Sequence, residues 1–409
     1  MKSLFILGAG TAGTIMAGRL RERLRPEQWN ITIIEENPAY YYQPGFLFLP
    51  FGIYSEQDVV RVRRPWIPPG VDYRVAEVDC IEAQRRKVRL KSGARLNYDI
   101  LIIATGVKIA PEQTEGMLGS DWGARVFDFY TFEGASALRG ALRNWNGGRL
   151  VVHITQMPIK CPVAPLEFAF LADQWLKDHR LRSRTEIVYV TPQPRLFSVP
   201  AVESFFGRFI EKKDVKVSTN FVTRSIDNER HKILSLNQRE IDYDLLVTVP
   251  VNAGDVAIGR SGIADELNLV PTNPDTLQSK EHRDIFVLGD AADLPWPKSG
   301  SVIHFHSEIL TENILHYIKE EPFASPPGGY AEWLAKSVEN KAFPLNCDPK
   351  LQRAGKNCQL PVLGPCGGAY FSHFRELAFR WIYGTSCPAV WRCRELALGL
   401  AETAETVSL

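Results

Sequence analysis

Short apolar runs alternate with helical patterns along most of the chain. The runs at residues 4–7, 31–34 and 100–103 have the length of buried strands rather than of helices. Between the first two runs, apolar residues recur at spacings of three and four over residues 11–24, which predicts a helix. Strands that alternate with helices favour a parallel sheet. The pattern therefore predicts an α/β fold.

The first apolar run leads directly into a glycine-rich turn, and the strand after the helix ends at Glu35. Glycines in such a turn allow the backbone to approach a pyrophosphate, and an acidic residue in this position reaches a ribose hydroxyl pair. A glycine-rich turn in an unrelated α/β protein is the alternative. We interpret the unit as a dinucleotide site, whose residues are Gly8, Gly10, Thr11, Ala12, Gly13 and Glu35.

Two later strands end in turns that are typical of flavin enzymes with two dinucleotide-binding domains. Residues 98–103 lead into Ala104, Thr105 and Gly106, and residues 284–288 lead into Gly289 and Asp290. The aspartate can accept a hydrogen bond from a ribityl chain. Because three parts of the pattern occur in order, we predict FAD rather than NAD. The FAD domain is expected at 1–110 and 245–320, and a second Rossmann-like (doubly wound) domain at 111–244.

A cysteine occupies the turn where a second glycine-rich loop would be expected. The apolar run at 150–154 precedes Pro158, Lys160, Cys161 and Pro162, and a helical pattern follows. The start of a helix favours a thiolate over a thiol, so we predict a redox role for Cys161. The missing glycines argue against tight NAD(P)H binding. Strands are expected at 186–190 and at 243–250, the last returning the chain to the FAD domain.

Two further stretches carry open alternatives. Residues 40–46 contain three tyrosines and predict an irregular loop, either core packing or a wall near the flavin. Lys298 follows the Gly-Asp turn and is either a cation near the flavin pyrimidine edge or a solvated loop lysine. His304 and His306, at the start of a helix to about residue 317, are expected to cap or pack rather than to catalyse.

Composition narrows the choice of partners and location. With 409 residues the chain has room for about two to three domains. Its net charge of +1 gives no indication of a nucleic-acid partner. Its seven cysteines include no CxxC pattern or His/Cys cluster, so we expect no metal site. No apolar run is long enough to span a bilayer. We expect no signal peptide, and a location on the cytoplasmic side.

The last part of the chain, residues 321–409, has a different character. Residues 320–340 are rich in proline, glycine and charge and are predicted to be a linker. Residues 369–383 combine aromatic residues at helical spacing with Arg375 and Arg380, the composition of an amphipathic helix at a membrane surface. A helix docked on the core or on a dimer partner is the alternative, and the oligomeric state stays open.

Taken together, these motifs resemble the sulfide:quinone oxidoreductase family, which is related to the flavoprotein subunit of flavocytochrome c sulfide dehydrogenase. The resemblance covers nearly the whole chain, and its most specific part is the turn from Cys161 to Glu167. It implies that Cys161 lies beside the flavin, that Glu167 faces the site, and that a second redox cysteine follows the linker. Cys347 fits that position, with Cys358 as the competitor. Many members attach FAD through a third cysteine, which residues 127–130 lack, so we expect non-covalent FAD.

The resemblance also implies the activity. Sulfide would be oxidised to polysulfide or sulfur by a Cys161/Cys347 redox pair, and the electrons would pass through FAD to a membrane quinone. The protein would be a peripheral, monotopic protein on the surface of the cell membrane. Three alternatives remain open: a sulfide dehydrogenase that reduces a cytochrome, a type II NADH:quinone reductase, and a non-catalytic flavoprotein scaffold.

Overall fold

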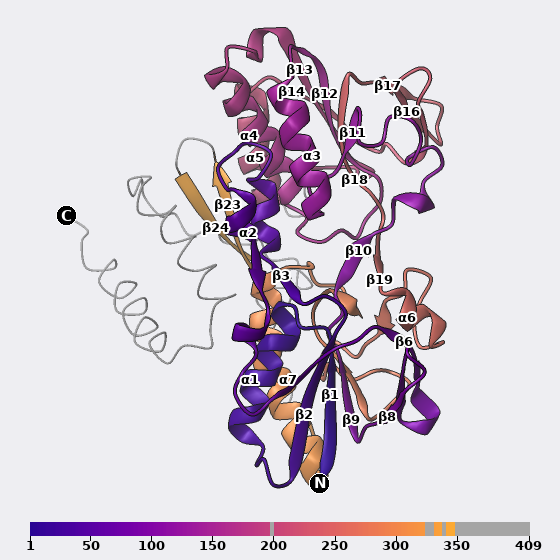
Figure 1. Cartoon of the computed structure of the whole chain (residues 1–409). Coiled ribbons are helices and arrows are strands. Elements are labelled where there is room, and N and C mark those ends of the chain that lie inside the picture. The colour runs from indigo at the N-terminus through magenta and orange to yellow at the C-terminus, as the bar shows by residue number, and fades with distance from the viewer. Residues whose placement is uncertain (197–199, 324–330, 338–340, 348–409) are drawn as a thin grey trace, which may run out of the picture.

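The first of the two five-stranded parallel sheets in the described part of the chain is built from the N-terminal half and one later strand (Figure 1). The computed structural model describes residues 1–196, 200–323, 331–337 and 341–347. The stretches at residues 4–7, 100–103 and 285–287 are apolar on both faces, as expected when both faces of the sheet are covered. From edge to edge the sheet contains β21 (Ile285–Val287), β9 (Ile100–Ile103), β1 (Lys2–Leu7), β2 (Trp29–Glu35) and β5 (Asp72–Val75).

One face of the first sheet is covered by α1 (Thr11–Arg23) and α7 (Gly300–Lys319), which pack against each other. Their buried faces include Met16, Leu20, Leu310 and Ile314. The antiparallel meander of β6 (Val78–Glu82), β7 (Lys87–Leu90) and β8 (Arg95–Asn97) covers the other face, together with α6 (Val256–Arg260). Short strands with alternating burial therefore take the place of the helices expected on this face of a doubly wound sheet.

The second sheet repeats the plan in the upper half of Figure 1. On one face it carries α3 (Phe132–Arg143), α4 (Ala164–Asp178) and α5 (Pro200–Lys212). On the other it carries the meander of β15 (Thr223–Asp227), β16 (Lys232–Ser235) and β17 (Glu240–Asp242). The parallel strands, in spatial order, are β11 (Val126–Phe127), β18 (Leu245–Val249), β12 (Gly148–Ile154), β13 (Thr185–Val190) and β14 (Val215–Ser218). The predicted α/β fold with parallel sheets is confirmed.

One predicted boundary is wrong. The strand expected to return the chain to the FAD domain, β18, lies inside the second sheet between β11 and β12. Its five residues are all buried, so its apolar run fills a central position there rather than a crossover. The two connections between the units instead pair as β10 (Val107–Ile109) and β19 (Asn252–Gly254), in the middle of Figure 1. The second unit therefore extends past residue 244.

The tyrosine-rich stretch is more ordered than predicted. It contains β3 (Ala39–Tyr41), paired with β4 (Val60–Val62), and a 3-10 helix, η1 (Gln43–Leu47), followed by α2 (Glu56–Val59). Phe46 to Leu49 are buried in the core of the second unit, and Phe51 stacks at an angle on Phe168, with ring centroids 5.0 Å apart. The stretch thus ties the first unit to α4.

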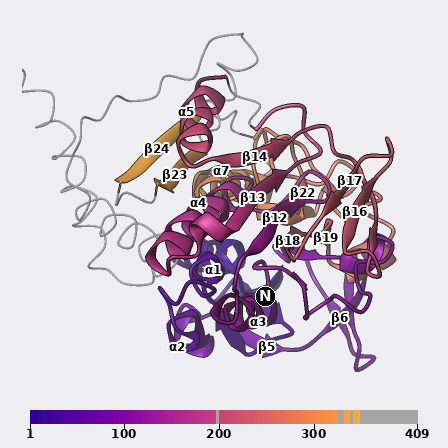
Figure 2. The same ribbon diagram turned by 90° about the horizontal axis from the view of Figure 1, so that it is seen from above.

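Part of the predicted linker is a β-hairpin. Strands β23 (Ala331–Ser337) and β24 (Lys341–Cys347) pair in antiparallel register, and β23 contacts α4 and α7 (Figure 2). The proline and glycine content of residues 320–340 therefore misled the prediction over 331–337. Cys358 and the aromatic segment 369–383 lie outside the described residues. Among the helices that are described, none combines the length and the apolar character needed to cross a bilayer.

Candidate flavin and redox site

Two glycines of the glycine-rich turn leave no room for a side chain, and a third borders open space. Gly8 has φ +96°, and a Cβ there would lie 2.5 Å from the Ala104 carbonyl oxygen. A Cβ at Gly13 would lie 1.9 Å from the Gly8 carbonyl oxygen. At Gly10, the N-cap of α1, a Cβ would meet none of the described atoms within 4 Å. The start of α1 thus has open space at Gly10, and the unpaired N–H groups that begin a helix suit a pyrophosphate.

Glu35 lies beside this turn, as predicted, but it also has protein partners. Its Oε2 accepts a hydrogen bond from the Ala9 N–H at 2.7 Å, and its Oε1 accepts one from the Asn37 N–H at 3.1 Å. A carboxylate has about four lone-pair sites, so both oxygens can still accept hydrogen bonds from a ribose.

Arg63, which the sequence analysis missed, holds Glu35 and the turn together. The side chain is buried and its guanidinium lies 3.7 Å from Glu35 Oε2. It donates to the carbonyls of Asn37 at 3.0 Å and Ala39 at 2.6 Å, and also to that of Ala9. Nothing in the sequence distinguishes it from its neighbour Arg64, because only the fold reveals which arginine turns inward.

The three turns predicted to bind FAD lie at one edge of the first sheet. Ala104 touches Gly8, and a Cβ at Gly289 would lie 3.3 Å from the Ala12 Cβ. Two polar atoms here, Thr105 Oγ1 and Asp290 Oδ1, are shielded from solvent without a hydrogen-bond partner in the described part of the chain. Such atoms in a native protein call for a ligand or an ion. The space at Gly10 and these unpaired atoms fit FAD.

Lys298 is neither solvated nor free to move. It is 6% exposed, and its Nζ donates to the carbonyls of Asp290 at 2.6 Å and Ala292 at 3.0 Å. Burial lowers the pKa of Lys298, and the charge of Asp290 opposes this. The alternative of a solvated loop lysine is therefore wrong. The side chain fixes the Gly-Asp turn, and a role toward the flavin stays a prediction.

The cysteine turn of the second unit docks on the segment that carries Lys298. The Cys161 N–H donates to the Lys298 carbonyl at 2.7 Å, and Lys160 and Lys298 form an isolated parallel β-bridge. Cys161 is partly buried and has φ +48°, an uncommon conformation for a residue other than glycine. It precedes α4 by three residues, and its carbonyl accepts the Ala164 N–H at 2.9 Å. The thiol thus lies just before the helix rather than in it.

Lys160 belongs to the cysteine turn and was given no role from the sequence. Its Nζ donates to Gln43 Oε1 at 2.8 Å and lies 5.6 Å from the centre of the Tyr130 ring. Burial lowers the pKa of Lys160, while the charges of Asp290, Asp128 and Cys161 raise it. An ammonium next to Cys161 thus interacts with the carboxylate of the Gly-Asp turn. Its position beside the cysteine in sequence was a signal that could have been used.

Glu167 lies near the same cysteine. It belongs to the first turn of α4 and is 2% exposed. Burial raises the pKa of Tyr130, and the charges on Cys161 and Glu167 act in the same direction, which places the three groups in one neighbourhood. The Tyr130 hydroxyl donates to the Cys161 carbonyl at 3.3 Å. A role for Glu167 in proton transfer at Cys161 stays a prediction.

The remaining predicted residues are less informative. Cys347 is the last residue of β24, opposite Ala331, so its partnership with Cys161 stays a prediction. Cys80 is a buried free thiol in β6. Within the described ranges, no group of three or more His, Cys, Asp or Glu side chains could hold a metal ion.

The described part of the chain thus has two five-stranded parallel sheets, with a glycine-rich turn at the edge of one and a cysteine turn in the other. The chain is similar to the mitochondrial sulfide:quinone oxidoreductase of Mus musculus, with 26% identity over 334 residues, covering 80% of this chain and 74% of the relative. It is also 23% identical to a sulfide-quinone reductase of Aquifex aeolicus over 364 residues, covering 84% and 83%. No protein-family model matches.

Among solved structures, the sulfide:quinone oxidoreductase of Aquifex aeolicus aligns with a TM-score of 0.78 at 20% identity, covering 94% of this chain and 92% of the other. At that sequence identity the alignment shows that the two chains share a fold. The resemblance to sulfide:quinone oxidoreductases that the motifs predict is confirmed by these matches.

Proposed function

We propose that this protein is an FAD-dependent oxidoreductase that oxidises sulfide and passes the electrons to a membrane quinone. The observation that carries the proposal is the hydrogen bond from Cys161 N–H to the Lys298 carbonyl. It joins a partly buried thiol to the segment that follows the Gly-Asp turn. The similarity to named sulfide:quinone oxidoreductases supplies the substrate and the acceptor.

FAD would be held by the first unit without a covalent bond. The pyrophosphate would bind at Gly10 and the start of α1, and the ribose would bind at Glu35. Thr105 and Asp290 would form hydrogen bonds with other polar groups of the cofactor. Residues 127–130 contain no cysteine for a thioether. Bound there, FAD would supply a two-electron acceptor for the sulfur centre that a quinone could reoxidise. The proposed arrangement is two Rossmann-like domains, with the FAD domain built from residues 1–110 and the segment that follows the second sheet.

Cys161 would act as a thiolate and as half of a disulfide with Cys347. Hydrosulfide attacks one sulfur of the disulfide, a sulfur–sulfur bond forms to give a persulfide, and the original bond breaks to leave a thiolate on the other cysteine. The ammonium of Lys160 and the start of α4 stabilise a thiolate at Cys161. Glu167 would take and return the proton. Quinone would arrive from a bilayer surface on which the C-terminal segment, 321–409, rests, making the protein a peripheral, monotopic membrane protein.

The test is flavin bleaching in the purified, FAD-loaded protein without oxygen. Sulfide should bleach the flavin absorbance, decylubiquinone should restore it, and NADH should have no effect. Cys161→Ser should abolish bleaching by sulfide, whereas the matched variant Cys80→Ala should retain it, because Cys80 lies in β6 of the other unit.

Each other outcome favours a different function. Bleaching by NADH alone would indicate a type II NADH:quinone reductase. Reoxidation by a cytochrome but not by quinone would indicate the sulfide dehydrogenase alternative. No bleaching by either donor would indicate a non-catalytic scaffold.

A further inference from the structure

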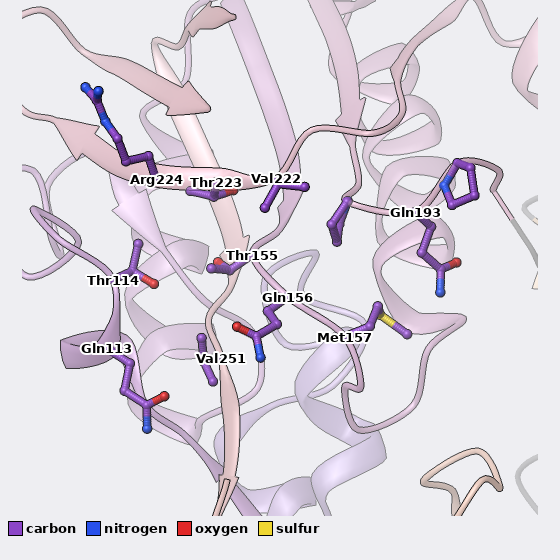
Figure 3. Close-up of a pocket in the computed structure, with 12 residues that line it drawn as sticks. Gln113, Thr114, Thr155, Gln156, Met157, Gln193, Val222, Thr223, Arg224 and Val251 are labelled. Atoms are coloured by element: carbon purple, nitrogen blue, oxygen red, sulfur yellow. The ribbon is translucent and has the colours of Figure 1, made fainter. Parts of the chain in front are cut away.

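A cavity of about 360 Å³ opens in the second unit, away from the turns that fit FAD (Figure 3). It lies where β12, β13 and β18 end, and β15 of the meander closes one side. Neither the predicted FAD residues nor the redox cysteines line it. The lining residues are Gln113, Thr114, Thr155, Gln156, Met157, Pro192, Gln193, Pro194, Val222, Thr223, Arg224 and Val251.

The position is one that parallel sheets commonly use for ligands. From β12 the sheet continues outward to β13 and β14 on one side, and to β18 and β11 on the other. The chain therefore reverses its direction of winding between β12 and β18, and the connections leave a crevice at the carboxyl ends of these strands. Ligands of doubly wound folds bind in such crevices.

The cavity holds a buried polar atom that lacks a partner. Thr155 is 7% exposed, and its Oγ1 has no hydrogen-bond partner in the described part of the chain, although its N–H is fixed by the Val249 carbonyl at 3.0 Å. In Figure 3 Thr155 and Gln156 lie near the middle of the cavity. A buried hydroxyl in this state costs stability unless a ligand satisfies it.

A neighbouring hydroxyl is held in place by a buried histidine. His153 Nε2 lies 2.7 Å from Thr223 Oγ1, and its Nδ1 lies 2.9 Å from Thr248 Oγ1. Burial lowers the pKa of His153 to about 3, so the ring is neutral near pH 7. The Thr223 hydroxyl at the edge of the cavity is therefore held in place by a neutral ring.

The side chains indicate the class of ligand. Three glutamine amides each offer a donor and an acceptor, as the edge of a nucleobase requires, and no carboxylate belongs to the lining. Met157, Pro192 and Val251 supply apolar surface for the faces of a ring. Arg224 stands at the rim, pointing away from the centre, where it can reach a phosphate (Figure 3).

The volume of the cavity and the side chains of the turn after β12 both argue against a dinucleotide. The volume is near the lower end of the range for ligand sites, about 300–1,000 Å³. The turn after β12 also carries the side chains of Gln156 and Met157 instead of glycines, so the backbone cannot approach a pyrophosphate. We propose that this cavity binds a purine mononucleotide such as AMP, independently of sulfide oxidation.

The experiment is calorimetric titration of the FAD-loaded protein with AMP, adenosine and NADH, with flavin absorbance as the check that FAD stays bound. AMP should bind with a dissociation constant below about 1 mM. Thr155→Val and Gln156→Leu should each weaken AMP and adenosine by at least about fivefold, since each removes a hydrogen bond to the bound base. Arg224→Met should weaken AMP but not adenosine. Gln28→Leu, an exposed glutamine in the other unit, should change nothing.

Three results would overturn the proposal. AMP could fail to bind at about 5 mM, a concentration well above any specific affinity of interest. It could bind with the same affinity to the parent and to both Thr155→Val and Gln156→Leu, which would place it elsewhere. NADH could bind more tightly than AMP with the same sensitivity to these variants, which would make the cavity part of a dinucleotide site. None of these results depends on whether sulfide bleaches the flavin.

Discussion

Replacing Lys160 by methionine tests whether its ammonium controls the thiol of Cys161. The substitution keeps the length of the side chain but removes a positive charge adjacent to the cysteine in sequence. Because a cation stabilises the thiolate, its loss should raise the thiol pKa, and the thiol should become reactive only at higher pH.

The size of the effect follows from Coulomb's law. Charges on adjacent side chains lie about 5–8 Å apart, and an effective dielectric constant of about 20 then gives an interaction of about 2–3 kcal/mol. Solvent reduces this here, because Lys160 and Cys161 are only partly buried. We therefore expect a rise in the pKa of about one unit, equivalent to about 1.4 kcal/mol.

The assay is the rate of alkylation of Cys161 by iodoacetamide as a function of pH. Reduced, FAD-loaded protein is used without oxygen, and the Cys161 peptide is quantified by mass spectrometry. Lys160→Met should move the midpoint upward by about one pH unit, whereas Lys160→Arg should restore it. Lys216→Met is the control, because Lys216 is exposed and pairs with Asp214 far along the chain. An identical midpoint in parent and Lys160→Met would refute the reasoning.

Further predictions concern the cofactor and the fold. Asp290→Asn should raise the FAD dissociation constant by about tenfold, since it removes a charged acceptor with an unpaired oxygen. Asp293→Asn is the control, because Asp293 is exposed and nearby. Equal FAD retention in both variants would contradict the assigned role of Asp290. Gly13→Ala should give no folded protein, because its Cβ would lie 1.9 Å from the Gly8 oxygen. Gly10→Ala should fold and lose only FAD affinity, because a Cβ there meets open space. Circular dichroism measures the folding and flavin absorbance measures the bound FAD. Asp173→Asn should lower the free energy of unfolding by about 3 kcal/mol in urea melts near pH 7, by breaking a buried ion pair.

The same aspartate predicts a dependence of stability on pH. Burial alone raises the pKa of Asp173, but hydrogen bonds from Lys177, Lys213 and Arg182 outweigh it, and the pKa is lowered overall. A lowered folded-state pKa contributes stability above the unfolded value, near pH 4, and that stability is lost as the pH falls further. Urea melts between pH 7 and pH 3 should show a smaller loss for Asp173→Asn than for the parent. A parallel loss in both proteins would show that other groups dominate.

Sequence reasoning identified the strands and turns because each carries a local requirement. Gly8 needs positive φ and Gly13 needs a missing side chain, so glycine appears there whatever the rest of the chain does. The hairpin β23–β24 was missed because the prolines and glycines that precede it suggested a linker and its two strands carry no clear alternation. The position of β18 was missed because an apolar strand of five residues carries no information about which sheet it joins.

The side chains that link distant segments could not be predicted for a different reason. Arg63 reaches Glu35 across 28 positions, and Lys160 reaches Gln43 across 117. Each of these residues is an ordinary polar residue locally, and its role depends on a packing arrangement that the sequence does not encode at short range. Sequence spacing suggested that Cys161 begins a helix. The fold instead places it before the helix, in a left-handed conformation that turns its N–H toward Lys298.

This docking brings one side of the second unit's turn after β12 against the first unit. In a parallel sheet the carboxyl end of the first strand normally meets a phosphate through glycine backbone. Here the turn after β12 carries Gln156 and Met157 toward one cavity and Lys160 and Cys161 toward the other unit. One seven-residue stretch, 155–161, therefore borders both candidate sites. If the two sites act independently, as proposed, the rate of alkylation of Cys161 should be the same with and without saturating AMP, and a changed rate would contradict that independence.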